Sequence, residues 1–537
     1  MISIRKLADC LFLPSAFSIR KDLLGWLNPA PVLSLAKEAA QIHCYKLADV
    51  PDVDQRWSSL PKNGANFCVP AATMNWLYFM GVPADPHSDP ATVLNLTQLG
   101  NQMDTDGDDG TGFSDGIEGL NAWLDDHQAV ALVVGATLTE GASVRIEHLR
   151  DWAALGGLVN VNMGRYSKND DELQRKTGHR MTMVGLHQSK GRCEIVVHNP
   201  DDDTSDLTTQ SATEEQKSAL VNEHWNIEGE GTTLPRWGTS TDPFRFIDGY
   251  VVIAPLFALT NANESALTYY QAALKTGRIA SRSFSLPFAG QLSGLAIHPR
   301  LPQAAVIAKG GVWTLNLASG TWRRIAALPA PTRLTYGGRA HRLFVVQERG
   351  LVSIDVETGA LRRTELPTPI DAITYSEHGN LIVATSVEAQ SIVSFTPNLD
   401  LHRRDELPDM PFRGPHFLSA DPRDGTIFAT NPRSSEVTTI DLTPAGAVVR
   451  TTTRLDGEPI SFVTQVNRRG VFYATGNGKI SAFDLAGHRV TAAVFAGLPA
   501  GSLLDVARSQ HNFDPRRSSL RQWRDSLETH AAADRDS

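Results

Sequence analysis

The chain has 537 residues, a formal net charge of −9, and 41% hydrophobic and 20% charged residues. Its length predicts about three domains, and its composition is that of a soluble globular protein. The negative charge argues against nucleic-acid binding, which usually needs a basic face. No apolar run approaches the roughly 20 residues of a membrane-spanning helix. We therefore expect a soluble multidomain protein with neither a nucleic-acid partner nor a transmembrane segment.

Residues 1–48 are interpreted as an N-terminal extension with features of a degenerate export signal. Arg20 and Lys21 precede an apolar stretch that is followed by small residues, the order of a signal peptide. Asn28, Pro29 and Pro31 interrupt that stretch, which also begins far from the first residue. The cellular location therefore stays open, with a slight preference for export to the periplasm or medium over the cytoplasm.

Residues 49–257 combine helical and strand patterns, with helices first and strands later. That order predicts an α+β domain. The helical patterns cover 70–80, 117–126 and 144–155, and the strand patterns cover 158–162, 181–185, 194–197 and 250–253.

Residues 258–280 are predicted to form a helical linker. Asn263 stands at a suitable N-cap position for a helix over 264–276, and Gly277 stands where that helix would end. The helix would connect the first domain to a second half of different character.

Residues 281–510 contain a repeat with a period of roughly 40 residues, which is typical of a four-stranded propeller blade. Five units are visible, and 282–286 together with 502–506 could complete a sixth. The pattern predicts a β-propeller of five or six blades that binds a protein, a glycan or a small molecule. Residues 511–537 are predicted to be a charged, flexible tail. The aligned segments begin at Thr314, Ser353, Ser394, Thr439 and Ala482.

The first candidate for catalysis is Cys68, which is followed by Pro70 and an apolar helical run. Proline is favoured in the first turn of a helix, so Cys68 is expected at a helix N-terminus. The free amides and positive dipole there favour a thiolate, and the Cys68 N–H could stabilise an oxyanion. From this segment alone, a buried structural cysteine is an equally good interpretation.

A second candidate group lies further along, where Gly178 and His179 precede an apolar strand and Asn199 follows the next one. Adjacent antiparallel strands can bring Asn199 beside His179. The amide would then fix the tautomer of an imidazole that acts as a base.

In this order, the motifs resemble those of papain-like cysteine peptidases, and most closely the bacterial double-glycine peptidases that cleave bacteriocin leaders. The resemblance covers about 50–255. It includes an upstream glutamine, Cys-x-Pro-Ala, an acidic loop with Gly-Thr, Gly-His, and a polar residue before proline. The matching positions are Gln55, Cys68 to Ala71, Asp104 to Gly112, Gly178 with His179, and Asn199 with Pro200.

The chain departs from the family pattern at three positions. Val69 replaces the usual glycine, and Asn199 replaces the usual aspartate, although papain itself uses an amide there. Gln55, the oxyanion residue that the resemblance implies, lies further upstream than in papain, and Asn63 and Asn66 are nearer to Cys68.

The resemblance implies hydrolysis of peptide bonds without a metal or organic cofactor. Cys68 would be the nucleophile, His179 the acid and base, and Asn199 the residue that orients the imidazole. Two other hypotheses stay open. One is a binding protein that combines the propeller with an inactive peptidase fold, and the other is an amidase or acyltransferase that uses the same cysteine–histidine pair.

Two other motifs have simpler explanations. Ser114 lies in a Gly-x-Ser-x-Gly string, but an acidic loop precedes it instead of the buried strand that a serine hydrolase needs. That loop has carboxylates at Asp104, Asp106 and Asp108, but it lacks the glycine and the final glutamate of a calcium-binding loop. We therefore expect a polar loop at the edge of the substrate cleft.

Overall fold

The computed structural model of the protein describes most of the chain from His43 to Ala507. The predicted export signal in residues 1–42 and the predicted tail at 511–537 lie outside the described residues. Within 43–507, the description omits 48–49, 84–88, 139–143, 170–171, 190–191, 202–222, 229–235, 238–244, 264, 273, 275–277, 289, 291, 309, 338–341, 348–349, 367, 408–415, 422–423, 431–434, 445, 456–461, 466–471, 477–478, 484–487, 490–494, 496–497 and 499–503.

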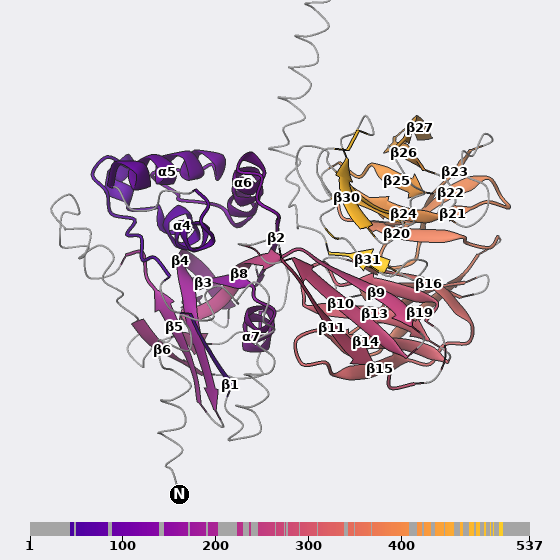
Figure 1. The fold of residues 1–537 in the computed structure, drawn as a ribbon, viewed down its shortest axis with the longest axis horizontal. Helices are drawn as coiled ribbons and strands as arrows, with labels where there is room; N and C mark the ends of the chain where they lie inside the picture. Colours follow the sequence, from indigo (N-terminus) through magenta and orange to yellow (C-terminus); the bar gives the residue numbers. More distant parts are fainter. Residues whose placement is uncertain are drawn as a thin grey trace, which may run out of the picture.

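Helices are confined to the first half of the described chain, where they precede most of the strands. The α-helices are α4 (Cys68–Met80), α5 (Asp89–Gln102), α6 (Phe113–Asp126) and α7 (Ile146–Ala154), and a short 3-10 helix, η1, covers Pro61–Gly64. Helix α4 contacts β3 and β4, and α5 and α6 pack beside it (Figure 1). None of the described helices combines the length and apolar character needed to cross a bilayer.

The strands of the first half form one eight-stranded sheet that closes on itself. The strand order is β1-β4-β3-β8-β7-β6-β5, and β2 pairs with β8. Because β5, the last strand in this order, also pairs with β4, the strands from β4 to β5 form a closed ring. The strands are β1 (His43–Lys46), β2 (Ala131–Thr137), β3 (Leu158–Asn169), β4 (Glu172–Ser189), β5 (Arg192–His198), β6 (Glu223–Glu228), β7 (Arg236–Trp237) and β8 (Arg245–Pro255).

The second half consists of antiparallel sheets, five with four strands and one with three in its described part. Each aligned repeat segment lies on the third strand of its sheet, and the apolar strand before it is the second strand. The repeat therefore follows the blades. In chain order the sheets comprise β9 to β11 with β31 (Phe257–Asn263, Ala266–Ala272, Ile279–Ser285, Leu504–Val506), β12 to β15 (Gly294–Ile297, Gln303–Ala308, Gly311–Asn316, Trp322–Ala326), β16 to β19 (Pro331–Gly337, Arg342–Gln347, Gly350–Asp355, Leu361–Glu365), β20 to β23 (Ala372–Ser376, Leu381–Ser386, Ser391–Phe395, Leu401–Glu406), β24 to β27 (Phe417–Ala420, Ile427–Thr430, Glu436–Thr443, Gly446–Arg454) and β28 to β30 (Phe462–Gln465, Phe472–Gly476, Lys479–Phe483).

A closed ring of contacts shows that these sheets are the blades of a β-propeller. The strands β12, β16, β20, β24 and β28 each contact the next in the series, and β31 contacts both β28 and β12. Strand β31 comes from the far end of the described chain but pairs with β9 in the first sheet. The described chain therefore forms six blades, and the first blade is completed by a late strand, which leaves the ring without an open edge.

Two predicted boundaries need correction. The segment 258–280, predicted to be a helical linker, instead contains β9, β10 and the start of β11, so the propeller begins at Phe257 and not at 281. Ala266–Ala272 contains one threonine and two tyrosines, residues that favour strands. The asparagine and glycine taken as helix caps are also common in turns. In addition, β1 lies before the predicted boundary at residue 49 but pairs with β4.

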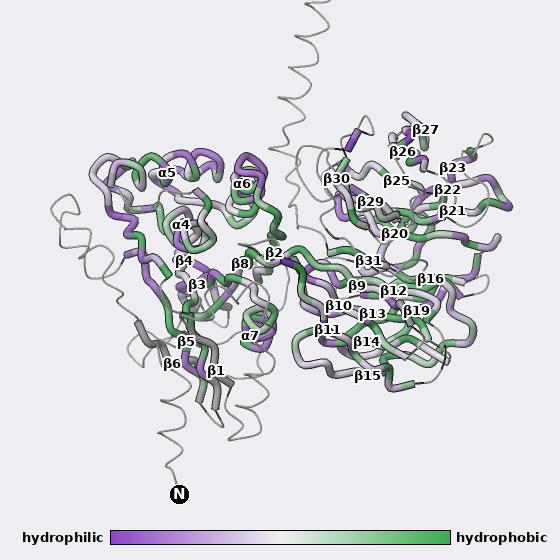
Figure 2. The backbone as a smooth tube through the Cα atoms, in the orientation of Figure 1, coloured by the Kyte–Doolittle hydropathy of each residue, from purple (hydrophilic) through white to green (hydrophobic). Residues whose placement is uncertain are grey.

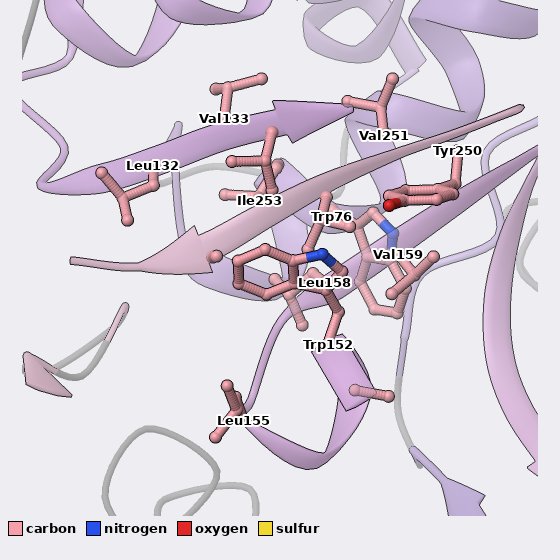
Figure 3. Close-up of a cluster of buried hydrophobic side chains, with 14 of the residues drawn as sticks. Trp76, Leu132, Val133, Trp152, Leu155, Leu158, Val159, Tyr250, Val251 and Ile253 are labelled. Atoms are coloured by element: carbon pink, nitrogen blue, oxygen red, sulfur yellow. The ribbon is translucent and has the colours of Figure 1, made fainter. Parts of the chain in front are cut away.

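The two halves lie side by side and share one hydrophobic core (Figure 1). Only Leu256 separates β8 from β9. Trp152 of α7 packs 6.5 Å from the ring of Phe257, and its indole N–H donates to the Arg300 carbonyl at 3.3 Å. Figure 3 shows Trp152 beside Tyr250 and apolar residues of β2, β3 and β8, and Figure 2 shows hydrophobic segments along the strands of both halves. The propeller is therefore packed directly against the first half.

Candidate functional site

Cys68 is the first residue of α4, as the position of Pro70 predicts. Almost all of the helix is buried, whereas Cys68 is partly exposed at its N-terminus. The residues directly after Cys68, Val69 to Ala71, are buried, so packing holds the helix end that presents Cys68. Because the first amides of a helix have no partner within it, the Cys68 thiol lies at the positive end of the helix dipole.

His179 lies on β4 at a position where one edge of the strand has no partner among the described strands. On the other edge, His179 pairs with Met163 of β3. The pairing with β5 begins only at Thr182. Helix α4, which begins at Cys68, contacts β4.

Asn199 directly follows β5, and its carboxamide contacts the imidazole. The oxygen Oδ1 lies 2.6 Å from Nε2 of His179 and also accepts a hydrogen bond from the backbone N–H of Asp201 at 3.2 Å. Since this oxygen can only accept, Nε2 carries a proton. The other ring nitrogen, Nδ1, is then the one that exchanges a proton with Cys68.

The pKa values of the pair are shifted in opposite directions. Burial raises the pKa of the Cys68 thiol, but the hydrogen bond and charge of His179, with smaller contributions from Arg180, outweigh it and the net pKa is lowered. Burial lowers the pKa of His179, but the interaction with Cys68 and the hydrogen bond to Asn199 outweigh it and the net pKa is raised. Both shifts favour a thiolate–imidazolium pair at neutral pH.

The side chain of Gln55 is 1% exposed and lies in the segment that precedes α4. Its Nε2 donates to the Ala65 carbonyl at 3.0 Å, which uses one of its two protons, and its backbone N–H donates to the Pro200 carbonyl at 2.8 Å. Gln55 is therefore attached to the segment that contains Asn199. One amide proton is left that could serve an oxyanion.

The two asparagines that lie nearer to Cys68 in the sequence are placed less well for that role. Asn66 Nδ2 donates to the carbonyls of Gly107 and Asp108, both at 2.7 Å, so both of its protons are used. Asn63 is exposed. Gln55 is thus the better side-chain candidate for the oxyanion role.

The alternative motifs lie elsewhere. Ser114 is in the first turn of α6, where no strand precedes it, so the serine-hydrolase motif lacks its structural context. The acidic loop folds back on itself between Asp106 and Gly110, and Asp108 pairs with Lys62. Within the part of the chain that the structure describes, no three potential metal ligands gather into a site.

The structure adds two residues to the site that the sequence did not indicate. Arg56 binds both carboxylate oxygens of Asp201, close to Asn199. Arg180 is buried with its charge beside Cys68. A charged residue between His179 and the largely apolar run that begins at Met181 is the one signal in the sequence that could have indicated Arg180.

Comparison with known proteins finds similarity only to solved structures. No protein-family model matches the chain. No curated protein matches it. The similar structures include a chain of a nidogen/laminin complex (14% identity, TM-score 0.38, covering 48% of this chain and 99% of that one) and a protein of unknown function from Bacteroides caccae (13%, 0.35, 48% and 100%). A third is virginiamycin B lyase from Staphylococcus aureus (16%, 0.31, 42% and 88%). The assignment of a propeller to this chain rests on its own strand order and ring of contacts.

Proposed function

We propose that the first half of the chain is a papain-like cysteine peptidase and that the propeller binds its substrate or a partner. The observation that carries the proposal is the hydrogen bond of 2.6 Å between His179 and Asn199, beside a partly exposed Cys68 at a helix start. Three residues from α4, β4 and the end of β5 meet here. This is the arrangement of nucleophile, base and orienting group that thiol hydrolases require.

In the proposed reaction, the Cys68 thiolate attacks a peptide carbonyl carbon and forms a tetrahedral oxyanion. The backbone N–H of Cys68 and the remaining amide proton of Gln55 are the donors available for that oxyanion. His179 gives the proton on Nδ1 to the leaving amine, the C–N bond breaks, and a thioester is left. Water then attacks the thioester, His179 accepts a proton from it, and the acid leaves as the thiolate is restored.

The propeller supports a binding role, since propellers offer a rim and a central channel for ligands. The interface at Trp152 fixes its position relative to the first half, so a ligand held on the propeller would have a defined position relative to Cys68. The candidate ligands of the propeller are proteins, glycans and small molecules.

The test is the rate of iodoacetamide labelling from pH 4 to 9, read at each cysteine by mass spectrometry, in the wild type and in His179→Ala. We expect fast labelling of Cys68 well below pH 8, slowed in the variant, because the imidazolium stabilises the thiolate. Cys193, which is 2% exposed on β5, is the internal control and should label slowly in both proteins.

A peptide library incubated with the wild type and with Cys68→Ala then distinguishes the activities. Cleavage that depends on Cys68 supports the peptidase. Release of ammonia, or transfer of the acyl group to an added amine without cleavage, would identify the amidase or acyltransferase instead. Labelling of Cys68 at the rate of an ordinary thiol would rule out an active enzyme of either kind and leave the propeller as the functional part.

A further inference from the structure

Arg180 is a buried cation with few partners. Its side chain is 2% exposed, and its Nε donates to Asn162 Oδ1 at 2.7 Å. Nη1 is buried and has no hydrogen-bond acceptor among the described residues. A guanidinium with an unused buried N–H is unusual, because buried polar groups are nearly always hydrogen-bonded.

Uncharged residues lie beside this guanidinium, among them Asn162, Gly116 and Val69. A Cβ atom added to Gly116 of α6 would lie 3.1 Å from Nη1 of Arg180 and 3.3 Å from Val69, so the guanidinium lies between α6 and the start of α4. Asp115, which precedes Gly116 in the sequence, has its carboxylate next to Gly112. Among the described residues, no carboxylate forms an ion pair with Arg180.

Cys68 is the charge partner that the surroundings provide. Burial lowers the pKa of Arg180 to about 10, and the Cys68 thiolate is the one charged group that acts against this shift. The backbone of Arg180 also helps to lower the pKa of the Cys68 thiol. Burying a cation without a counter-charge is costly, and a thiolate beside it would offset that cost.

We propose that Arg180 is a positioning residue that holds Cys68 as a thiolate whether or not His179 is protonated. The inference rests on the proposed function only in taking Cys68 as the nucleophile. In this arrangement the Cys68 thiolate interacts with two cations, the imidazolium of His179 and the guanidinium of Arg180, instead of with His179 alone. His179 is then free to give up its proton to a leaving group without the thiolate losing all of its stabilisation.

The test compares Arg180→Met and Arg180→Lys with the wild type by iodoacetamide labelling of Cys68 between pH 5 and 9. We expect the midpoint of the labelling curve to rise by about one pH unit or more in Arg180→Met, which is roughly a tenfold loss of rate below the midpoint. Arg180→Lys keeps the charge and should stay closer to the wild type. Arg362→Met, an exposed substitution in the propeller, is the matched control and should label like the wild type.

A second measurement begins with a variant in which Arg180 is unchanged, so its first outcome does not depend on the folding of an Arg180 variant. In His179→Ala, the midpoint for Cys68 should still lie below the roughly 8.5 of a free thiol, and it should reach that value only when Arg180→Met is added. A midpoint at 8.5 or above in His179→Ala alone overturns the proposal. So does an unchanged midpoint in a folded Arg180→Met.

The outcomes also separate this inference from the proposed function. If labelling depends on Arg180 but no peptide is cleaved, the inference stands and the peptidase does not. If peptides are cleaved and the labelling midpoint does not depend on Arg180, the peptidase stands and the inference is wrong.

Discussion

Arg56 and Asp201 form a paired hydrogen bond across 145 residues of sequence, with Nε and Nη2 of the arginine 2.6 and 2.9 Å from the two carboxylate oxygens. Asp201 in turn donates its backbone N–H to Asn199. The pair therefore connects the segment before α4 with the residue that orients His179. The ion pair thus lies between the part of the site that contains Cys68 and the part that contains His179 and Asn199.

From this arrangement we expect Arg56→Ala to lower the reactivity of Cys68 more than it lowers stability. Both side chains are 31% exposed, and ion pairs that solvent reaches contribute about 1 kcal/mol or less. The loss of position at Asn199 would instead slow labelling of Cys68 at neutral pH. Thermal unfolding and iodoacetamide labelling check the two effects, with Arg362→Ala as the control for an exposed ion pair. The prediction would be contradicted if Arg56→Ala slowed the labelling of Cys68 no more than Arg362→Ala does.

Asn199→Ala should reduce turnover without unfolding the protein. The variant removes the acceptor for Nε2 of His179, and hydrogen bonds to a charged partner contribute about 1.5–3 kcal/mol, or roughly 10- to 100-fold in rate. The measurement is kcat on any peptide that the wild type cleaves. Asn199→Asp keeps an acceptor oxygen and should retain more activity than Asn199→Ala. If both variants retained full activity, Asn199 would not orient the imidazole.

The interface of the two halves contains a buried carboxylate that should make stability depend on pH. Asp151 of α7 accepts a hydrogen bond from Asn316 of the propeller at 2.6 Å, and burial raises its pKa. A raised pKa in the folded state means that the contribution of Asp151 is full below the unfolded value near 3.9. It is lost as pH rises through the folded pKa.

Asp151→Asn removes this titration, so its stability relative to the wild type should increase as pH rises from about 4 and then level off. Unfolding midpoints of the two proteins between pH 4 and 8 measure the difference. Asn316→Ala is the complementary variant: it removes a bond that lowers the Asp151 pKa and should make the loss of stability with pH steeper. A difference that does not change with pH would show that Asp151 does not control this interface.

Trp152 provides a test of how far the propeller and the first half unfold as one unit. Its side chain is 2% exposed, and Trp→Ala at such sites costs about 3–5 kcal/mol because it leaves a cavity. Trp152→Phe keeps an aromatic ring beside Phe257 and loses mainly the bond to the Arg300 carbonyl, worth about 1 kcal/mol. We expect a single calorimetric transition in the wild type and two separate ones in Trp152→Ala. A single transition in Trp152→Ala would mean that other contacts join the two halves.

Much of the propeller was predictable because its signals are local and repeated. The aligned segments at Thr314, Ser353 and Ser394 each predict a strand from their own alternation, and the constant spacing identifies them as the same strand in successive blades. The strand 504–506, part of the segment 502–506 named for a sixth unit, does lie in the first blade. The strands β9 and β10 of the same sheet were missed, since the asparagine and glycine in the segment 258–280 suit turns as well as helix caps.

In the candidate site, the sequence by itself determined the position of Cys68 at a helix start, through Pro70, and the approach of Asn199 to His179, through two adjacent strands. Both depend on short-range geometry. Only the tertiary structure decided that Arg180 lies buried against α6, that Arg56 reaches Asp201, and that the Asn66 side chain donates its hydrogen bonds to the acidic loop. Those contacts join elements far apart in the sequence, and they arise from how the helices and the closed sheet pack together, which no local pattern encodes.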